Sequence, residues 1–234
     1  MKILAIEHAA GRAKGIQETI SIVAPDADVT VAQVYLGTAL PSFRDFDAII
    51  PGGGPMGVYE IDKPEYDFIK READYLKAAI DAGIPILAIC FGHQLVAHIL
   101  GGEVIRDENK REIGWFDISQ NPDGQRSKIF SEVPQSFKLF QFHYDRIARL
   151  PDNVKVLATS DNCDVQALAY ESLPIHSAQF HPEISAAQGR AIFESLRDKL
   201  EAKGYNVDLL IQQSDSISEQ ARRQFFANFI SLLK

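Results

Sequence analysis

The segment around Cys90 constrains the fold more than any other part of the chain. Ile86 to Ile89 is an uninterrupted apolar run of strand length, and beyond it apolar residues recur at helical spacing from Leu95 to Leu100. The sequence therefore predicts a buried strand that turns into a helix at Cys90. Gly92 suits a turn too tight for a Cβ, of the kind that lifts a reactive side chain out of the top of a parallel sheet.

Cys90 is a candidate nucleophile because of where this corner places its sulfur. The first free N–H groups of the predicted helix and its positive end lie beside the side chain, which favours thiolate over thiol. A free cysteine is also among the residue types most often buried as a small hydrophobe. The residue alone leaves both interpretations open, and a base within reach would favour the nucleophile.

A base with an orienting acid is predicted near the other end of the chain, at His181 and Glu183. If this segment is extended, residues two apart project to the same side, so the carboxylate reaches the ring nitrogen that faces away from the sulfur. Pro182 between them restricts the backbone. A surface His-Pro-Glu turn is the alternative. Because Cys90 and His181 are far apart in sequence, the fold must bring them together.

The third candidate feature is a predicted strand that runs into Gly52, Gly53 and Gly54. A bare glycine backbone presents N–H groups to an anion, so both a phosphate cradle and an oxyanion hole are compatible with it. The spacings G-x-x-x-x-G-K-[ST] and G-x-G-x-x-G before a helix are absent from the sequence. An oxyanion hole therefore fits better.

The rest of the chain predicts an α/β fold: a flavodoxin-like open, mostly parallel sheet with helices on both faces. The middle of the chain is richer in strand pairs, which predicts an antiparallel extension. Ligands of such sheets gather at the carboxyl ends of the parallel strands. Besides the strand and helix around Cys90, strands are expected at 2–7, 29–35, 46–50, 103–105, 113–118, 154–159, 165–170 and 175–180, and helices at 15–23, 62–81, 186–202 and 218–234.

Residues 1–234 are expected to form a single domain, with the helices from about 186 to 234 packing on it. We find no internal repeat, low-complexity tract or linker in the sequence. The last predicted helix carries an apolar stripe that is more typical of a core than of a partner surface. The stripe consists of Phe225, Phe226, Phe229, Ile230 and Leu233.

Composition excludes several classes of function. A net charge of −8 with no basic run argues against nucleic acid as a partner. No apolar run approaches the length of a membrane span, and the start of the chain lacks the pattern of a signal peptide. Two cysteines without paired spacing, Cys90 and Cys163, indicate a reducing cytoplasm rather than a disulfide scaffold or a metal site.

Three motifs in this order resemble the class I (triad-type) glutamine amidotransferases, over roughly residues 1 to 190. They are Gly52-Gly53-Gly54-Pro55, Cys90-Phe91-Gly92-His93-Gln94 and Gln179-Phe180-His181-Pro182-Glu183. Two further segments, Glu112-Ile113-Gly114-Trp115 and Phe140-Gln141-Phe142-His143-Tyr144-Asp145, are most similar to stand-alone relatives of the glutaminase domain of GMP synthetase, which include gamma-glutamyl peptidases.

The resemblance implies an amidohydrolase that needs no metal or organic cofactor. In this mechanism Cys90 attacks the carboxamide carbon of a glutamine-like substrate, His181 carries the proton to departing ammonia, and Glu183 holds the imidazolium. The oxyanion is expected at the N–H of Phe91, next after the nucleophile, and at that of Gly54. A water then hydrolyses the thioester.

The resemblance also implies substrate contacts at Gln94, Tyr144 and Asp145. A tyrosine stands at position 144 where many relatives have glycine, and its bulk is expected to reshape the pocket. His143 is expected either to bind substrate or to make a structural hydrogen bond. Cys163, in a polar turn, is expected to be exposed or half-buried, and His8 and His93 show no partner pattern.

Three functions remain open at the level of sequence. A glutaminase passes ammonia to a separate synthetase subunit, because this chain has no nucleotide-binding loop of its own. A stand-alone hydrolase cleaves gamma-glutamyl amides or peptides. A catalytically idle module of the same fold binds a ligand without turning it over, but the presence of Cys90, His181 and Glu183 together argues against it.

Overall fold

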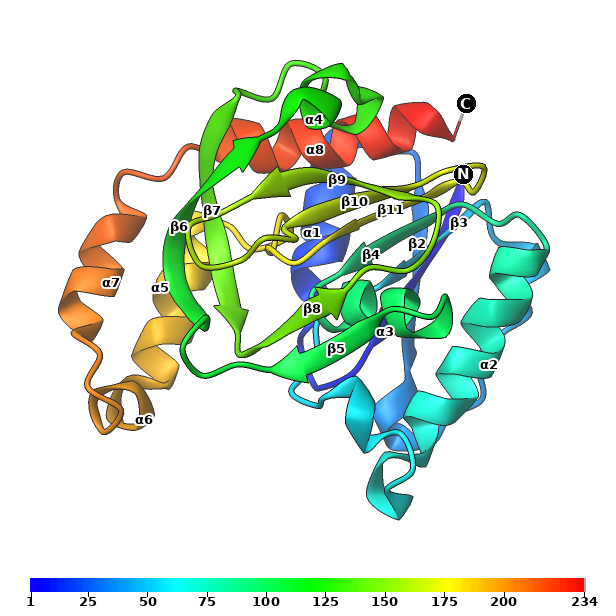
Figure 1. Ribbon diagram of the computed structural model, residues 1–234, viewed down its shortest axis with the longest axis horizontal. Coiled ribbons are helices and arrows are strands. Elements are labelled where there is room, and N and C mark those ends of the chain that lie inside the picture. Colours follow the sequence, from blue (N-terminus) through cyan, green and yellow to red (C-terminus); the bar gives the residue numbers. More distant parts are fainter. Residues whose placement is uncertain (234) are drawn as a thin grey trace.

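An open sheet with strands of both directions runs through the protein (Figure 1). The computed structural model describes residues 1–233. Its strands are β1 (Lys2–Glu7), β2 (Asp28–Gln33), β3 (Ala48–Pro51), β4 (Ile86–Ile89), β5 (Glu103–Arg106), β6 (Glu112–Gln120), β7 (Ser136–His143), β8 (Asp145–Arg149), β9 (Val154–Thr159), β10 (Ala167–Tyr170) and β11 (Ile175–Ala178). Its helices are α1 (Lys14–Val23), α2 (Asp67–Asp81), α3 (Phe91–Ile99), α4 (Pro122–Arg126), α5 (Ala186–Ser195), α6 (Arg197–Glu201), α7 (Val207–Ser214) and α8 (Glu219–Leu232).

The main sheet has the strand order β2-β1-β3-β4-β11-β10-β9-β6-β7. Its first five strands are parallel, and from β11 onward each neighbour is antiparallel. The predicted fold class, a parallel sheet with an antiparallel extension, is confirmed. Strands β5 and β8 form a separate two-stranded ribbon. Within residues 1–233, none of the helices combines the length and the apolar character that a bilayer span requires.

Side chains alternate along the parallel strands between two cores, one on each face of the sheet. In β1, Ile3 and Ala5 face the core beneath α1 and α8, whereas Leu4 and Ile6 face the core beneath α2 and α3. A strand buried on both faces is typical of a parallel sheet covered by helices. Helix α8 contacts α1 from the opposite end of the chain, which supports our proposal that the chain forms one domain.

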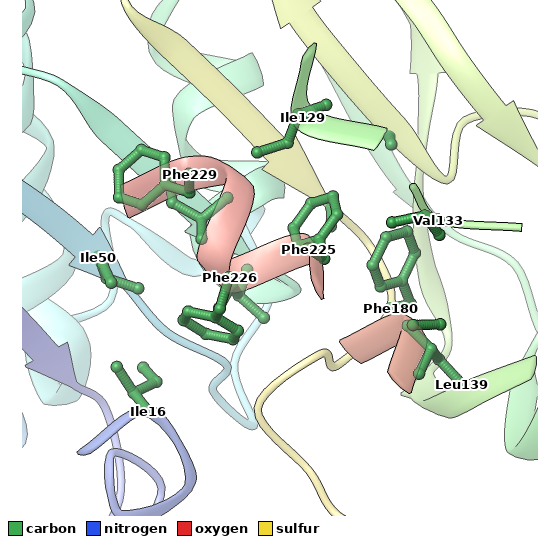
Figure 2. Close-up of a cluster of buried hydrophobic side chains, with 14 of the residues drawn as sticks. Ile16, Ile50, Ile129, Val133, Leu139, Phe180, Phe225, Phe226 and Phe229 are labelled. Atoms are coloured by element: carbon green, nitrogen blue, oxygen red, sulfur yellow. The ribbon is translucent and has the colours of Figure 1, made fainter. Parts of the chain in front are cut away.

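The predicted stripe on the last helix lies in this core. Figure 2 shows Phe225, Phe226 and Phe229 of α8 among side chains that come from α1, β3, β7 and the segment before Val133. Phe180, which immediately precedes His181, packs against Phe225 with 5.3 Å between ring centroids. The C-terminal helix therefore anchors the segment that carries the candidate base. Lys234, the last residue of the predicted helix, lies outside the described residues.

The prediction of one helix over 186–202 is wrong. The helical conformation is interrupted at Leu196, whose φ of −109° and ψ of 10° separate α5 from α6. The break directs Leu200 into a buried cluster with Phe193 and Val207, so α7 can return along α5 (Figure 1). Burial of these side chains outweighs the local helical propensity.

Several predicted boundaries shift because local turn chemistry overrides the hydrophobic pattern. The second strand ends at Gln33, and a 3₁₀ turn follows at Val34–Leu36. The helix expected from residue 62 begins at Asp67, after a 3₁₀ turn that opens with Pro64. The strand expected over 175–180 ends at Ala178.

Four elements were not predicted: α4, β7, β8 and α7. Strand β7 alternates only at its start, at Phe137 and Leu139, which face the core with α8. The next residue, Phe140, is buried on the opposite face against Phe193 of α5. Its period therefore gives no clear strand signal. Helix α7 is amphipathic but only eight residues long, with one large apolar side chain, Leu209, exposed.

Replacement of Phe226 by alanine should lower the free energy of unfolding by about 3–5 kcal/mol, because the ring is fully buried and its loss leaves a cavity between α8 and the sheet. Chemical denaturation measures the change. Leu209→Ala is the matched control, since this side chain is 49% exposed and should change stability by about 0.5 kcal/mol or less. Equal losses in the two variants would contradict the role assigned to α8.

Candidate active site

Cys90 occupies a strained corner between β4 and α3. Its φ of 51° and ψ of −103° lie in a region that side chains rarely adopt, at a cost of about 1–3 kcal/mol. Gly92 makes the corner possible, because a Cβ there would lie 2.2 Å from the carbonyl oxygen of Pro51. The predicted tight turn is confirmed, and it presents the Cys90 side chain at the positive end of α3.

His181 and Glu183 form a short, buried hydrogen bond, with 2.6 Å between Nδ1 and Oε1. The predicted contact is present, but the backbone between them is a turn rather than the extended segment expected from sequence. The N–H of Ile184 donates to the carbonyl of His181, which closes that turn. Because Nδ1 faces the carboxylate, Nε2 is the ring nitrogen available to Cys90.

The first turn of α1 approaches the Glu183 backbone and side chain closely. A Cβ on Gly15 would lie 2.6 Å from the carbonyl oxygen of Glu183 and 3.1 Å from its Cγ, so a glycine is needed here. The first turn of α1, the positive end of that helix, consequently stands beside Glu183.

The environment of His181 favours a protonated ring. Burial opposes the positive charge, but the charge of Glu183 and the sulfur of Cys90, with hydrogen bonds to both, outweigh it and raise the pKa of His181 to about 10. An imidazolium beside the sulfur stabilises a thiolate. We therefore expect an ion pair between Cys90 and His181, with Glu183 behind the ring.

The glycine turn after β3 lies directly over these two side chains. A Cβ on Gly53 would lie 2.8 Å from Cε1 of His181 and 3.6 Å from Cβ of Cys90. Gly54 lines the same pocket, and Phe91 is the first residue of α3, so its N–H has no acceptor within the helix. The Phe91 ring itself is buried in the core and leaves only its backbone at the site.

A pocket of about 220 Å³ joins the predicted residues. It contains Cys90 and His181 together with Gly54, Gln94, Tyr144 and Asp145, so six of the eight residues singled out from sequence line it. Glu183 and Phe91 lie directly behind it. Three other polar residues line the pocket: Arg12, Arg106 and His143. No sequence pattern marks the two arginines, because tertiary structure alone brings their loops to this edge.

A buried amide network contacts the sulfur of Cys90. Gln179 donates from Nε2 to Sγ of Cys90 at 3.6 Å, and its Oε1 accepts from Nε2 of Gln94 at 3.0 Å. Gln94 also donates to the carbonyl of Asp145 at 3.1 Å. Gln179 stands in one of the sequence motifs, but its contact with the nucleophile was not predicted.

Tyr144 forms a wall of the pocket between two cations. The guanidinium of Arg106 lies 4.5 Å from the ring centroid, and the ammonium of Lys203 lies 4.8 Å from it and donates to the hydroxyl at 2.9 Å. Burial raises the pKa of Asp145, an effect that a hydrogen bond from Tyr59 and the charge of Arg106 partly offset. The expectation that residue 144 shapes the pocket agrees with this placement.

His143 makes two structural hydrogen bonds as well as lining the pocket. Its Nδ1 lies 3.1 Å from the carbonyl of Asp145, which can only accept, so this nitrogen carries a proton. Its Nε2 lies 2.9 Å from the buried carboxylate of Glu112. Both interpretations left open by the sequence are therefore compatible with its position.

One expectation about a residue outside the motifs is wrong. Cys163 is buried rather than exposed or half-buried, because its segment folds back and its thiol donates to the carbonyl of Val165; burial raises its pKa to about 12. His8, whose sequence context shows no partner pattern, is a buried residue paired with Glu72, 64 positions away. No group of three or more metal-binding side chains occurs within residues 1–233.

One pocket at the carboxyl ends of the parallel strands brings together a cysteine at a strand-to-helix corner, a histidine–glutamate pair and a glycine turn. This arrangement is typical of a nucleophilic hydrolase-type site on an α/β sheet. The sequence profile described as glutamine amidotransferase class-I matches residues 14–199. The chain belongs to this family. The predicted resemblance and the predicted class of enzyme, a glutamine amidotransferase, are confirmed.

Individual relatives agree with this placement. The chain is 42% identical over 154 residues to a subunit of the glutamine-hydrolyzing GMP synthase of Pyrococcus furiosus, covering 64% of this chain and 79% of that protein. It is 34% identical to the glutamine-hydrolyzing GMP synthase of Neisseria meningitidis over 62% of this chain, but this spans only 26% of the longer protein. A glutamine amidotransferase structure from Thermotoga maritima superimposes with a TM-score of 0.88 at 28% identity, covering 100% of this chain and 98% of that one.

The ion pair should be visible in the alkylation of Cys90 by iodoacetamide. Because the raised pKa keeps His181 protonated at about pH 6.5, the wild-type sulfur should react there as a thiolate, whereas His181→Gln should slow the reaction at least about 10-fold. Mass spectrometry measures the rate. Cys163 is an internal control and should stay unmodified in the folded protein. Identical rates for the two proteins would contradict the ion pair.

Proposed function

We propose that the protein is a cysteine amidohydrolase that releases ammonia from the γ-carboxamide of glutamine through a thioester. The observation that carries the proposal is the single pocket shared by Cys90 and His181, with Glu183 bonded to the far side of the ring. The relatives whose names describe glutamine-hydrolyzing GMP synthases support glutamine as the substrate.

In this mechanism the Cys90 thiolate attacks the carboxamide carbon, and the carbonyl oxygen becomes an oxyanion. The N–H groups of Gly54 and Phe91 stabilise this oxygen, since donors aimed at developing charge commonly contribute about 10²–10³ in rate. His181 gives its proton to the departing nitrogen, so ammonia leaves and a thioester remains. His181 then takes a proton from water, and hydroxide attack on the thioester yields glutamate and restores the thiolate.

We further propose that a separate synthetase subunit receives the ammonia. The relative from Pyrococcus furiosus, whose name makes it one subunit of a larger GMP synthase, supports this partner. Gln94 is a proposed contact of the bound glutamine, and Tyr144 and Asp145 are the proposed contacts of its amino-acid end, because all three line the pocket beside Cys90. We propose the cytoplasm as the compartment.

Cys90→Ala should reduce ammonia release from glutamine by about 10⁴-fold or more, because no other side chain that lines the pocket can form the thioester. Glu183→Gln should lower kcat by about 10²-fold or more without a large change in KM, because the ring loses the charge that holds its proton. Coupled detection of ammonia gives both constants. Cys163→Ala, remote from the pocket and buried, is the control; Cys90-independent turnover would contradict the mechanism.

A γ-glutamyl peptide is a second candidate substrate, and the charge of the pocket favours it. Two arginines, Arg12 and Arg106, stand at the pocket of a protein whose net charge is −8. Glutamine brings one carboxylate, whereas a γ-glutamyl peptide brings a second one on the leaving group. The loop that carries Arg12 is fixed by Glu7, whose Oε1 accepts from the N–H of Ala13 at 2.9 Å.

If the second carboxylate binds Arg12, Arg12→Ala should raise KM for a γ-glutamyl dipeptide about 10-fold, the effect of losing one charge-assisted contact. KM for glutamine should change less than about twofold. Lys14→Ala is the matched control, because this cation lies two residues further along and 72% of its side chain is exposed. Equal effects on both substrates would exclude Arg12 as a peptide contact.

A further inference from the structure

His8 and Glu72 form a fully buried polar pair behind the glycine turn and the start of α3. His8 follows β1 and Glu72 lies in the middle of α2, and 2.7 Å separates Nε2 from Oε2. Both side chains are 0% exposed. Neither residue lines the pocket, so the proposed chemistry does not use them directly.

The His8 side chain contacts both segments that supply the proposed oxyanion donors. Its ring packs edge-on against Phe91, with 4.8 Å between centroids and 70° between planes. On the other side, a Cβ at Gly54 would lie 2.9 Å from Cβ of His8, so the glycine turn rests directly on this residue. One side chain therefore touches the two residues whose N–H groups must converge on one oxygen.

Burial of these polar groups in apolar surroundings costs free energy of folding. Within residues 1–233, Nδ1 of His8 and Oε1 of Glu72 are buried without a hydrogen-bond partner, while neighbouring residues such as Phe68 and Ile69 form an apolar core. Two well-packed hydrophobic residues of similar size are often as stable as, or more stable than, a buried polar pair of this kind. A hydrogen bond, unlike apolar packing, fixes the direction in which the ring points.

We propose that His8 and Glu72 are positioning residues for the oxyanion hole: their hydrogen bond fixes the His8 side chain, whose ring packs against Phe91 and whose Cβ meets Gly54. The positioning role rests on the proposed function and adds to it a pair of residues that lies behind the oxyanion hole. A donor displaced by a fraction of an ångström stabilises the oxyanion less, but it leaves substrate binding and the reactivity of the thiolate unchanged.

The decisive variant is the double substitution His8→Leu with Glu72→Leu, which replaces the pair by apolar side chains and leaves no buried group unpaired. It should fold with a melting temperature equal to or above that of the wild type. Its kcat for the preferred γ-glutamyl substrate should fall about 10-fold or more, with KM within about twofold. Glu72→Gln keeps the shape and one hydrogen bond, and it should retain activity within about threefold.

Two controls separate positioning from loss of folded protein. Labelling of Cys90 by iodoacetamide, which forms no oxyanion, counts the folded sites and should proceed at the wild-type rate. Asp74→Asn removes one charge from the exposed side of α2, two residues from Glu72, and should have no effect. A glutamine analogue with a chloromethyl ketone in place of the carboxamide passes through an oxyanion, so its labelling rate should fall in parallel with kcat.

The outcomes distinguish this proposal from the proposed function. If the wild type hydrolyses a γ-glutamyl substrate or is labelled by the chloromethyl ketone, and the folded double variant matches it, the positioning role is wrong and the enzyme assignment stands. If the wild type does neither, the proposed function is wrong and the positioning role falls with it. A loss of kcat that is matched by a loss of iodoacetamide labelling would show disruption of the whole site and would overturn the proposal.

Discussion

The site depends on the close approach of Gly92 to the end of β3. The N–H of Gly92 donates to the carbonyl of Gly52 at 3.1 Å, and a Cβ at Gly92 would collide with the carbonyl of Pro51. This contact joins the start of α3 to the start of the glycine turn, so Cys90 and the turn cannot move independently. The N–H of Cys90 also donates to the carbonyl of Ala178, which ties the same corner to β11. Neighbouring strands on both sides therefore stabilise the strained backbone of Cys90.

Burial is the second constraint, because it makes the charges of the site interdependent. Without Glu183, the low-dielectric surroundings of His181 would remove its proton, and the sulfur of Cys90 would lose its counter-charge. The carboxylate in turn lies beside the positive end of α1, which reaches it only because residue 15 is a glycine. The expected ion pair at the centre of the site thus has behind it a helix from the opposite end of the sequence.

Sequence predicted the parts of the site that are encoded locally. The corner and the pair could be inferred without coordinates because short segments of sequence determine their geometry. These segments are the apolar run before Cys90, the glycine after it, and the spacing of His181 and Glu183. The polar contacts between distant segments could not be predicted from the sequence. Gln179 reaches the sulfur and Glu72 reaches His8 only because sheet topology brings their elements together, and no periodicity in the sequence marks such a partner. Strand β7 was missed for a related reason, since burial on both sides removes the alternation that identifies a strand.

The parallel and antiparallel parts of the sheet contribute different residues to the pocket. Cys90 and the glycine turn follow parallel strands, whereas Tyr144 and Asp145 stand where β7 passes into β8, in the antiparallel part and its ribbon. The carbonyl of Phe140 in the same β7 accepts the N–H of His181, so the extension also holds His181 in place. Substitutions at the junction of β7 and β8 can therefore change this wall of the pocket while the Cys90 corner and the His181–Glu183 pair keep their geometry. Tyr144, which contacts Arg106 and Lys203 at this junction, forms such a wall, and we expect it to act on substrate choice together with Arg12, which follows β1 of the parallel core.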